Sequence, residues 1–324
     1  MRRNYVNVWR ALLMGLILPG ILLNTVVFFR ERREEPVVQE VQEAGSVPLK
    51  MKLLKSDGTD VDMDLDAYLV RVVLGEMPAG FDAEALKAQA VAARTFTRKA
   101  WITGGKHGDG SVCTSSRCCQ AYITEEQYLA GGGTEENLEK VRSAVTQTSG
   151  EVLTYDGELI EAVYFSCSGG STEDAAAVWG VAYPYLQSVD SPGEEEAAVY
   201  WDRVSFSPEE FQSALGVSLS GEADSWFGKT LYTKGGGVGE MEIGGVRYDG
   251  TQLRSLLGLR STVFSVETEG NVITFTTRGY GHRVGMSQYG AEAMAVAGSR
   301  YDEILSHYYP GAVVVKIDTG NALL

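Results

Sequence analysis

The sequence predicts an α+β fold: an N-terminal transmembrane helix followed by a domain of two lobes that border a groove. Three observations lead to this prediction. An apolar run covers residues 11–29. From residue 47 onward, stretches with strand-like alternation and stretches with helical spacing are mixed along the chain. Residues 192–263 are the least patterned part, and we interpret them as a smaller lobe within a domain over 47–324.

The composition excludes some partners. The chain has 324 residues and a formal charge of −15 at pH 7. Nucleic acid is therefore not an expected partner, because binding phosphates requires a basic surface. The same charge argues against a polybasic attachment to anionic lipid. A neutral or weakly charged polymer, such as a glycan, is compatible with it. Four cysteines are too few for a disulfide scaffold.

The N-terminal segment is predicted to anchor the chain in a membrane. As a helix, residues 11–29 would span about 28 Å, close to the roughly 30 Å hydrocarbon core of a bilayer. The alternative is a cleaved signal peptide, but the run is long for one and no small-x-small site follows directly. Arginines on both sides leave the orientation open. We expect a short tail over 1–10 and a charged linker over 30–46.

Residues 64–98 predict two helices with a short connection that carries Glu76. Asp64 and Asp82 stand where helix N-caps are expected. Pro78 disfavours helix at the residue before it, so Glu76 should lie at the end of the first helix. There the helix dipole and apolar neighbours would raise the pKa of its carboxyl toward that of a proton donor. The alternative is a solvated loop glutamate.

Residues 104–122 predict a long loop with a metal-binding pattern. His107, Cys113 and Cys119 are evenly spaced, with Cys118 beside the last. Imidazole and thiolate are ligands that zinc prefers, and four-coordinate structural sites close loops of this kind. Two alternatives remain open: a disulfide from Cys113 to Cys118 or Cys119, or free thiols.

Two further stretches carry polar residues at places where regular structure should end. Residues 151–174 predict a β-hairpin that turns at Asp156-Gly157 and ends in YFSCSGG. Residues 277–311 are rich in glycine before two helices, expected over Gly290–Ala297 and Tyr301–Tyr308. The glycine-rich part offers the donors, acceptors and aromatic platform that a carbohydrate groove needs, namely His282, Ser287, Gln288 and Tyr289. A helix N-cap is the alternative role for the serine, and a core contact for the tyrosine.

Three strings in these stretches resemble the signatures of one protein family. They are GEMPAGFDAEALKAQAVAARTFT at 75–97, YFSCSGG at 164–170 and RGYGHRVGMSQYGA at 278–291. They are similar to strings of the stage II sporulation protein D family, the bacterial lytic transglycosylases of engulfment. The set of histidine and cysteines resembles that of clostridial-type members, which carry a zinc site. The resemblance covers nearly everything outside the N-terminal segment.

The resemblance implies an activity. Glu76 would be the catalytic acid that cleaves the MurNAc–GlcNAc bond of peptide-stripped peptidoglycan and leaves 1,6-anhydro ends. A structural zinc would bind His107, Cys113 and Cys119, with Cys118 available as a fourth ligand. The residues assigned to the substrate cleft are Arg94, Ser166, Ser168, His282, Ser287, Gln288 and Tyr289.

The resemblance also implies a setting. The tail at 1–10 would be cytoplasmic, and the catalytic domain would lie outside the mother-cell membrane, facing the intermembrane space. The implied partners are peptidoglycan glycan strands, the amidase called stage II sporulation protein P, and the membrane protein M. A second function is also considered: a non-catalytic, glycan-binding enhancer of a cell-wall amidase.

Overall fold

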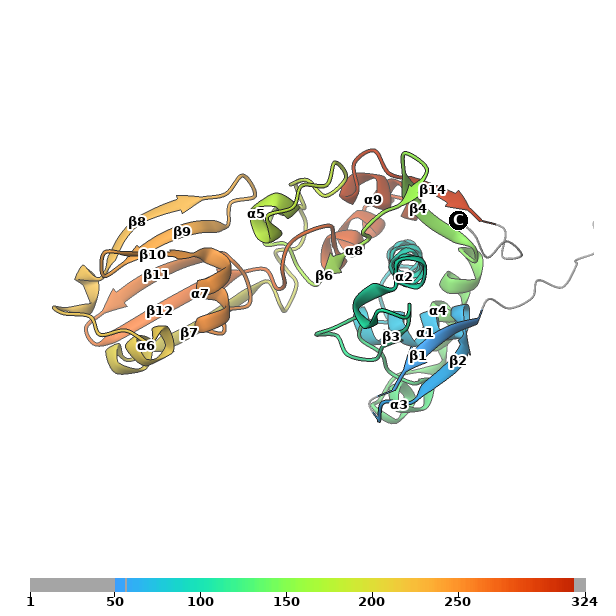
Figure 1. Ribbon diagram of the computed structural model, residues 1–324, viewed down its shortest axis with the longest axis horizontal. Helices are drawn as coiled ribbons and strands as arrows, with labels where there is room; N and C mark the ends of the chain where they lie inside the picture. Colours follow the sequence, from blue (N-terminus) through green and yellow to red (C-terminus); the bar gives the residue numbers. More distant parts are fainter. Residues whose placement is uncertain (1–49, 56, 318–324) are drawn as a thin grey trace, which may run out of the picture. The chain divides into compact units, whose positions relative to one another are not determined.

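Helices and small sheets are mixed in this chain, so the α+β prediction is confirmed (Figure 1). The structure is a computed structural model that describes residues 50–55 and 57–317. The predicted tail, membrane anchor and linker, over 1–46, lie outside the described residues. In the described ranges, no helix has both the length and the apolar character needed to cross a membrane.

Two consecutive helices contribute much of the main hydrophobic cluster: α1 (Leu65–Glu76) and α2 (Ala83–Thr103). Asp64 accepts a hydrogen bond from a backbone amide in the first turn of α1, and Asp82 does the same for α2. Both N-caps are those predicted from the sequence. Five of the seven alanines of α2 are buried, and their small side chains let other elements approach this helix closely.

Helix α2 is surrounded by other elements (Figure 1). Its neighbours are α1, α4 (Glu135–Gln147), α8 (Gln288–Val296), α9 (Tyr301–Tyr308) and the strand β4 (Glu151–Tyr155). Two shorter helices, α3 (Glu125–Ala130) and α5 (Ala175–Trp179), complete this part of the chain. The helix expected over Gly290–Ala297 begins two residues earlier, and the one over Tyr301–Tyr308 has the predicted bounds.

Small sheets contribute further to this part of the chain. Their remaining strands are β1 (Lys50–Leu54), β2 (Asp60–Asp64), β3 (Val112–Cys113), β5 (Glu158–Leu159), β6 (Tyr164–Phe165), β13 (Met286–Ser287) and β14 (Val313–Lys316). The strand orders are β2-β1-β3 and β14-β4-β5, and β6 pairs in parallel with β13. This last pairing brings the YFSCSGG and GMSQ strings side by side, although they lie far apart in the sequence.

The predicted hairpin forms only in part. Asp156 and Gly157 make the turn, both with positive φ, and β4 pairs with β5 as expected. The second strand, β5, ends at Leu159, however. The chain then leaves this sheet, and its next strand, β6, pairs with β13 instead. Alternation along 158–165 therefore reflects two short strands in different sheets, which a local pattern does not distinguish from one long strand.

A second hydrophobic cluster is built around Phe211. The ring of Phe211 is stacked on Trp226 and Phe275, with centroids 6.1 and 5.9 Å apart. The elements of this part are β7 (Trp201–Phe206), α6 (Pro208–Leu215), η2 (Ala223–Ser225), β8 (Phe227–Tyr232), β9 (Val238–Ile243), β10 (Val246–Asp249), α7 (Gly250–Leu256), β11 (Val263–Glu269) and β12 (Val272–Arg278). They form two sheets, with orders β11-β12-β7 and β10-β9-β8.

A buried arginine connects segments from both clusters. The guanidinium of Arg283 donates to the carbonyl oxygens of Ser168, Ser171 and Gly235, at 2.8, 2.7 and 2.5 Å. It also forms a buried ion pair with Glu173 at 3.5 Å. A buried charge without partners costs free energy, so the guanidinium must keep these partners. The bonds therefore hold the three carbonyl groups and Glu173 in place around Arg283.

Candidate active site

A cavity of about 860 Å³ opens beside the C-terminal end of α1. Its wall includes the end of α1, the loop up to residue 121, the chain around β6 and the glycine-rich stretch that leads into α8. Phe96 of α2, Trp179 of α5 and Tyr183 complete the lining. The predicted site residues that line it are Glu76, Ser166, His282 and Gln288, together with Cys118 and Cys119 of the loop.

Glu76 is the last residue of α1, as Pro78 predicts. Its Oε1 accepts a hydrogen bond from the backbone amide of Ala121 at 2.5 Å. This contact depends on Gly75, where a Cβ atom would lie 2.8 Å from the backbone nitrogen of Tyr122 and 2.9 Å from the carbonyl carbon of Ala121. The glycine therefore lets helix and loop come close enough for the carboxyl to reach the amide.

Burial raises the pKa of the Glu76 carboxyl. Hydrogen bonds from the Ala121 amide and from the side chain of Gln288, which lies 3.4 Å from Oε2, lower it and offset only part of this effect. The direction agrees with the prediction from the sequence. A carboxyl in this environment keeps its proton to a higher pH than an exposed glutamate does, and a general acid needs this property.

Buried polar side chains fix the wall around Glu76. The amide nitrogen of Gln120 donates to the hydroxyls of Tyr68 and Thr97, each at 3.0 Å. Its amide oxygen accepts from the hydroxyl of Tyr164 at 2.7 Å. No local motif indicates these residues, because they come from α1, α2, β6 and the loop before residue 121. Connected hydrogen bonds of this kind hold the side chains in one arrangement.

His282 lies in an aromatic part of the wall. Its ring centroid is 5.5 Å from that of Phe165 and 5.3 Å from that of Trp179. Its Nδ1 accepts a hydrogen bond from the Val284 amide at 3.1 Å. Burial, with a smaller effect of nearby positive charges, lowers the pKa of His282 to about 4. The imidazole is therefore neutral near pH 7, and it can shape the wall and accept hydrogen bonds.

Arg94 and Tyr289, both predicted for the cleft, are not among the residues that line the cavity. The buried guanidinium of Arg94 lies 3.1 Å from Asp66 and donates to the carbonyl oxygen of Val145 at 3.1 Å. Asp66 belongs to α1 and Val145 to α4, so Arg94 connects α2 to both of these helices. The ring of Tyr289 packs edge-on against Phe81, with centroids 5.1 Å apart. This is the core contact considered as its alternative role.

Ser168 and Ser287 also lie outside the cavity wall, and both bind one buried carboxylate. Glu194 accepts hydrogen bonds from the amide and hydroxyl of Ser168, each at 2.8 Å, and from the Gly169 amide at 3.1 Å. It also accepts from the hydroxyls of Ser191 and Ser287, at 2.7 and 2.5 Å. Ser287 in addition caps α8. Glu194 thus joins the YFSCSGG and GMSQ strings, which border the cavity, without lining the cavity itself.

The sequence gives only a weak signal for Glu194. It is one of three consecutive glutamates in an acidic stretch, and its donors come from segments far apart in the chain. Of the described residues that line the cavity, Glu161 is the other one with a carboxyl group, and it too was not predicted. Its Oε1 lies 3.1 Å from Nζ of Lys99.

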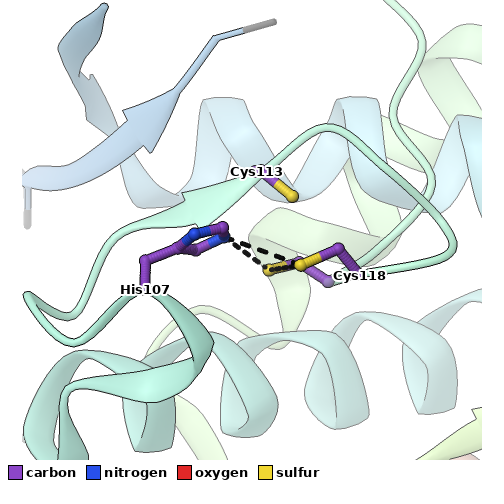
Figure 2. A group of neighbouring side chains, drawn as sticks. His107, Cys113 and Cys118 are labelled. Carbon is purple, nitrogen blue, oxygen red and sulfur yellow. Dashed lines mark hydrogen bonds between the residues drawn. The ribbon is translucent and has the colours of Figure 1, made fainter. Parts of the chain in front are cut away.

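The loop that forms one side of the cavity also gathers four metal-binding side chains: His107, Cys113, Cys118 and Cys119. Their ligand atoms all lie within 4.8 Å of one another. Figure 2 shows the side chains of His107, Cys113 and Cys118 directed toward a common space. The thiols are free, so the disulfide considered as an alternative is not formed in this structure.

The distances among three of these ligand atoms, those of His107, Cys118 and Cys119, fit the corners of a tetrahedral zinc site. Nε2 of His107 lies 3.7 Å from Sγ of Cys118 and 3.5 Å from Sγ of Cys119, and the two sulfurs are 3.9 Å apart. Ligands at zinc distances of about 2.3 Å for sulfur and about 2.0 Å for nitrogen stand about 3.5 to 3.8 Å apart at tetrahedral corners. One imidazole and three thiolates are also a known structural zinc set.

Comparison with known proteins identifies the family. A family model described as "Stage II sporulation protein" matches residues 58–155. Stage II sporulation protein D of Bacillus amyloliquefaciens is 39% identical over 84% of this chain and 80% of its own length. The chain belongs to the stage II sporulation protein D family.

Other relatives extend the comparison. Stage II sporulation protein D of Bacillus subtilis (strain 168) is 39% identical over 88% of this chain and 84% of its own length. A protein of the same organism named "Amidase enhancer" is 30% identical over 76% of this chain, and the aligned part is 40% of that protein. Membership of the family connects this chain to sporulation, which the resemblance of the three strings also implied.

Proposed function

We propose that this chain is a lytic transglycosylase that cleaves the MurNAc–GlcNAc bond of peptide-stripped peptidoglycan during engulfment. The observation that carries the proposal is Glu76. It is a half-buried carboxyl in a cavity wall, its pKa is raised by burial, and two hydrogen-bond donors hold it in place. Family membership supports a role in sporulation, and the size of the cavity is compatible with sugar units.

In the proposed reaction, Glu76 is first an acid and then a base. Its carboxyl proton moves to the glycosidic oxygen, the bond from that oxygen to C1 of MurNAc breaks, and positive charge builds on C1. The C6 hydroxyl of the same sugar attacks C1, and the Glu76 carboxylate takes the hydroxyl proton. The product is a 1,6-anhydro end, and no water is consumed. Attack within one sugar has an entropic advantage over recruiting a second molecule.

The contacts of Glu76 serve both steps. Burial favours the protonated form before proton transfer. After the transfer, the amide of Ala121 and the side-chain amide of Gln288 both donate hydrogen bonds to the carboxylate and stabilise its charge. Ordinary glycosidases use two carboxyl groups. If the reaction used water, Glu161 would be the second group to consider.

We propose a structural role for the His107, Cys113, Cys118 and Cys119 cluster. With zinc bound, all four positions around the ion would be filled by protein ligands, and such an ion holds a chain segment in place. The cavity wall includes the neighbouring loop residues Cys118 to Ala121. The cluster would therefore keep in position the Ala121 amide that binds Glu76. A zinc-bearing, clostridial type of the family is part of this proposal.

The proposed setting follows from the family. Residues 11–29 would form a single membrane anchor, with the catalytic domain outside the cytoplasm, facing the intermembrane space from the mother cell. The proposed partners are the amidase called stage II sporulation protein P, which would supply peptide-free strands, and the membrane protein M as a scaffold. A substrate groove between the two lobes is proposed to extend the cavity.

A second function is a glycan-binding enhancer of a cell-wall amidase. The observation that favours it is the relative named "Amidase enhancer". The two functions differ in whether the chain itself cleaves glycan, so they can be separated by one assay.

The proposal predicts that Glu76→Gln abolishes glycan cleavage. The glutamine keeps the shape of the side chain but has no acidic proton, and loss of a general acid costs about 10²- to 10⁴-fold in rate. The measurement is the rate at which the full chain cleaves peptide-free glycan strands.

Glu139→Gln is the matched control, because Glu139 is an exposed residue of α4 that does not line the cavity. It should cleave at the rate of the unaltered chain. Full activity of Glu76→Gln would contradict the proposed mechanism. Glycan binding and amidase stimulation without any cleavage by the unaltered chain would support the enhancer function instead.

A further inference from the structure

Two positive charges in the cavity wall have no role in the mechanism above. Lys106 and Arg117 line the cavity, and both are exposed. Among residues 50–55 and 57–317, neither forms an ion pair. The chain as a whole carries a formal charge of −15. Two unpaired cations in one wall are therefore a local reversal of the overall charge.

Both cations lie next to residues of the metal-binding cluster. Lys106 directly precedes His107, and Arg117 directly precedes Cys118, so each cation is next to a cluster residue. The ammonium of Lys106 also donates a hydrogen bond to the carbonyl oxygen of Cys118. Residues 106 and 118 are thus in contact, so the two segments that carry the cations meet at the cluster.

The positive charge extends to the aromatic side of the cavity. After burial, the charges of Arg254 and Lys106 are the next causes that lower the pKa of His282. His282 also lines the cavity. An anionic group bound in this region would meet a favourable potential, which is stronger in a partly enclosed space than in open water.

Peptide-free glycan presents such an anion. In intact peptidoglycan, the lactyl carboxyl of MurNAc is joined to the stem peptide by an amide bond and carries no charge. Hydrolysis of that amide adds water and releases a free carboxylate on the sugar. We infer that Lys106 and Arg117 bind this lactyl carboxylate and thereby select peptide-free strands. An arginine can donate two parallel hydrogen bonds to a carboxylate, and a lysine adds a point charge.

This inference rests on the proposed function, in which an amidase already supplies peptide-free strands. What it adds is the part of the chain that selects them: the loop that carries the metal-binding cluster, and not the residues around Glu76.

The test compares two forms of the same peptide-free strand. One has free lactyl carboxylates, and in the other these are converted to methylamides, which removes the charge with little change in size. Binding is measured with the full chain carrying Glu76→Gln, so that no strand is cleaved. We expect about tenfold tighter binding of the carboxylate form at low salt, and a smaller ratio at high salt.

The deciding variant adds Lys106→Met and Arg117→Met. It should bind both strands equally, with its affinity for the methylamide form unchanged, which also shows that it is folded. The matched control adds Lys229→Met and Arg247→Met, which remove two exposed charges of β8 and β10 and should keep the preference. Lys106→Arg with Arg117→Lys keeps both charges and should retain most of the preference.

Equal binding of the two strands by the Glu76→Gln chain overturns the inference, as does an unchanged preference in the Lys106→Met, Arg117→Met variant. In either case the strands still bind, and the proposed function is untouched. Absence of binding to both strands contradicts the proposed function itself, and the inference fails with it.

Discussion

At the scale of single residues, the properties of Glu76 depend on its neighbours. Gly75 lets the backbone of residues 121–122 come close, and this contact both buries the carboxyl and supplies the Ala121 amide. Burial favours the protonated form of the Glu76 carboxyl, and the hydrogen bond from the Ala121 amide favours the carboxylate form. A group that must first give and then accept a proton needs both forms to be accessible.

Gly75→Ala should therefore impair the site more than the fold. A Cβ atom at Gly75 would meet backbone atoms of Tyr122 and Ala121 at 2.8 and 2.9 Å, so the loop must move. We expect a loss of about 1–3 kcal/mol in the free energy of unfolding. We also expect about a hundredfold loss of cleavage, since small displacements of a catalytic group are costly. Urea denaturation and the cleavage rate measure the two effects.

Gly80→Ala is the control for this prediction. Gly80 lies in the same connection, but the nearest atom to an added Cβ is 3.9 Å away, so stability should change by less than about 0.5 kcal/mol. If Gly75→Ala were as active as Gly80→Ala, close contact between α1 and the loop would not matter for the site.

At the scale of elements, the short strands beside the cavity are held together by a buried polar group and not by long runs of strand pairing. Strands β6 and β13 are paired over two residues each. Next to them, Glu194 binds Ser168, Gly169 and Ser287. This carboxylate replaces the ladder hydrogen bonds that a longer sheet would supply.

Glu194→Gln should destabilise the protein. One acceptor oxygen becomes an NH₂ group, which faces hydrogen-bond donors in a buried place, and the expected cost is about 1–3 kcal/mol. Thermal or urea unfolding provides the measurement. Glu195→Gln is the matched control, because the side chain of Glu195 is exposed. Its free energy of unfolding should lie within about 0.5 kcal/mol of that of the unaltered chain. Equal stability of the two variants would show that Glu194 does not hold these segments.

The loop with the metal-binding cluster should require zinc. We expect the chain purified without chelator to contain about one zinc ion, and Cys113→Ser to contain much less. Without the ion, the loop would lose its fixed position, so both the unfolding temperature and glycan cleavage should fall. Atomic absorption, thermal unfolding and the cleavage assay test this.

Cys167→Ser is the control for the zinc measurement. Cys167 is a buried thiol whose Sγ lies 3.2 Å from Glu194, and it is not part of the cluster. Its substitution should leave the zinc content unchanged. Full zinc content in Cys113→Ser, or none in the unaltered chain, would contradict the proposed metal site.

At the scale of the whole molecule, the sequence predicted features that local chemistry determines. The end of α1 at Glu76 follows from Pro78, and both central N-caps follow from an aspartate before an apolar pattern. The cluster residues lie close together in the sequence, so their spacing alone suggested that they could meet. Of the predicted cleft residues, Ser166, His282 and Gln288 line the cavity.

Features that depend on long-range packing were not predicted. Arg94 looked available on a helix face, but α2 is enclosed and its guanidinium is buried against Asp66. Glu194 and Gln120 acquire their roles only when distant segments meet. The buried ion pair of Arg283 and Glu173 also forms only when distant segments meet, and it was not predicted either. Residue type and spacing report such contacts only when a motif is known beforehand.

The most direct test of the central claim is the mass of the products. The full chain and its Glu76→Gln variant are incubated with peptide-free glycan strands, and the new ends are analysed by mass spectrometry. We predict ends that lack one water, the 1,6-anhydro form, from the unaltered chain only. Ends that contain the water would contradict a transglycosylase and point to a hydrolase that uses Glu161 as its second carboxyl. No cleavage, with binding intact, would contradict the enzymatic function and favour the amidase enhancer.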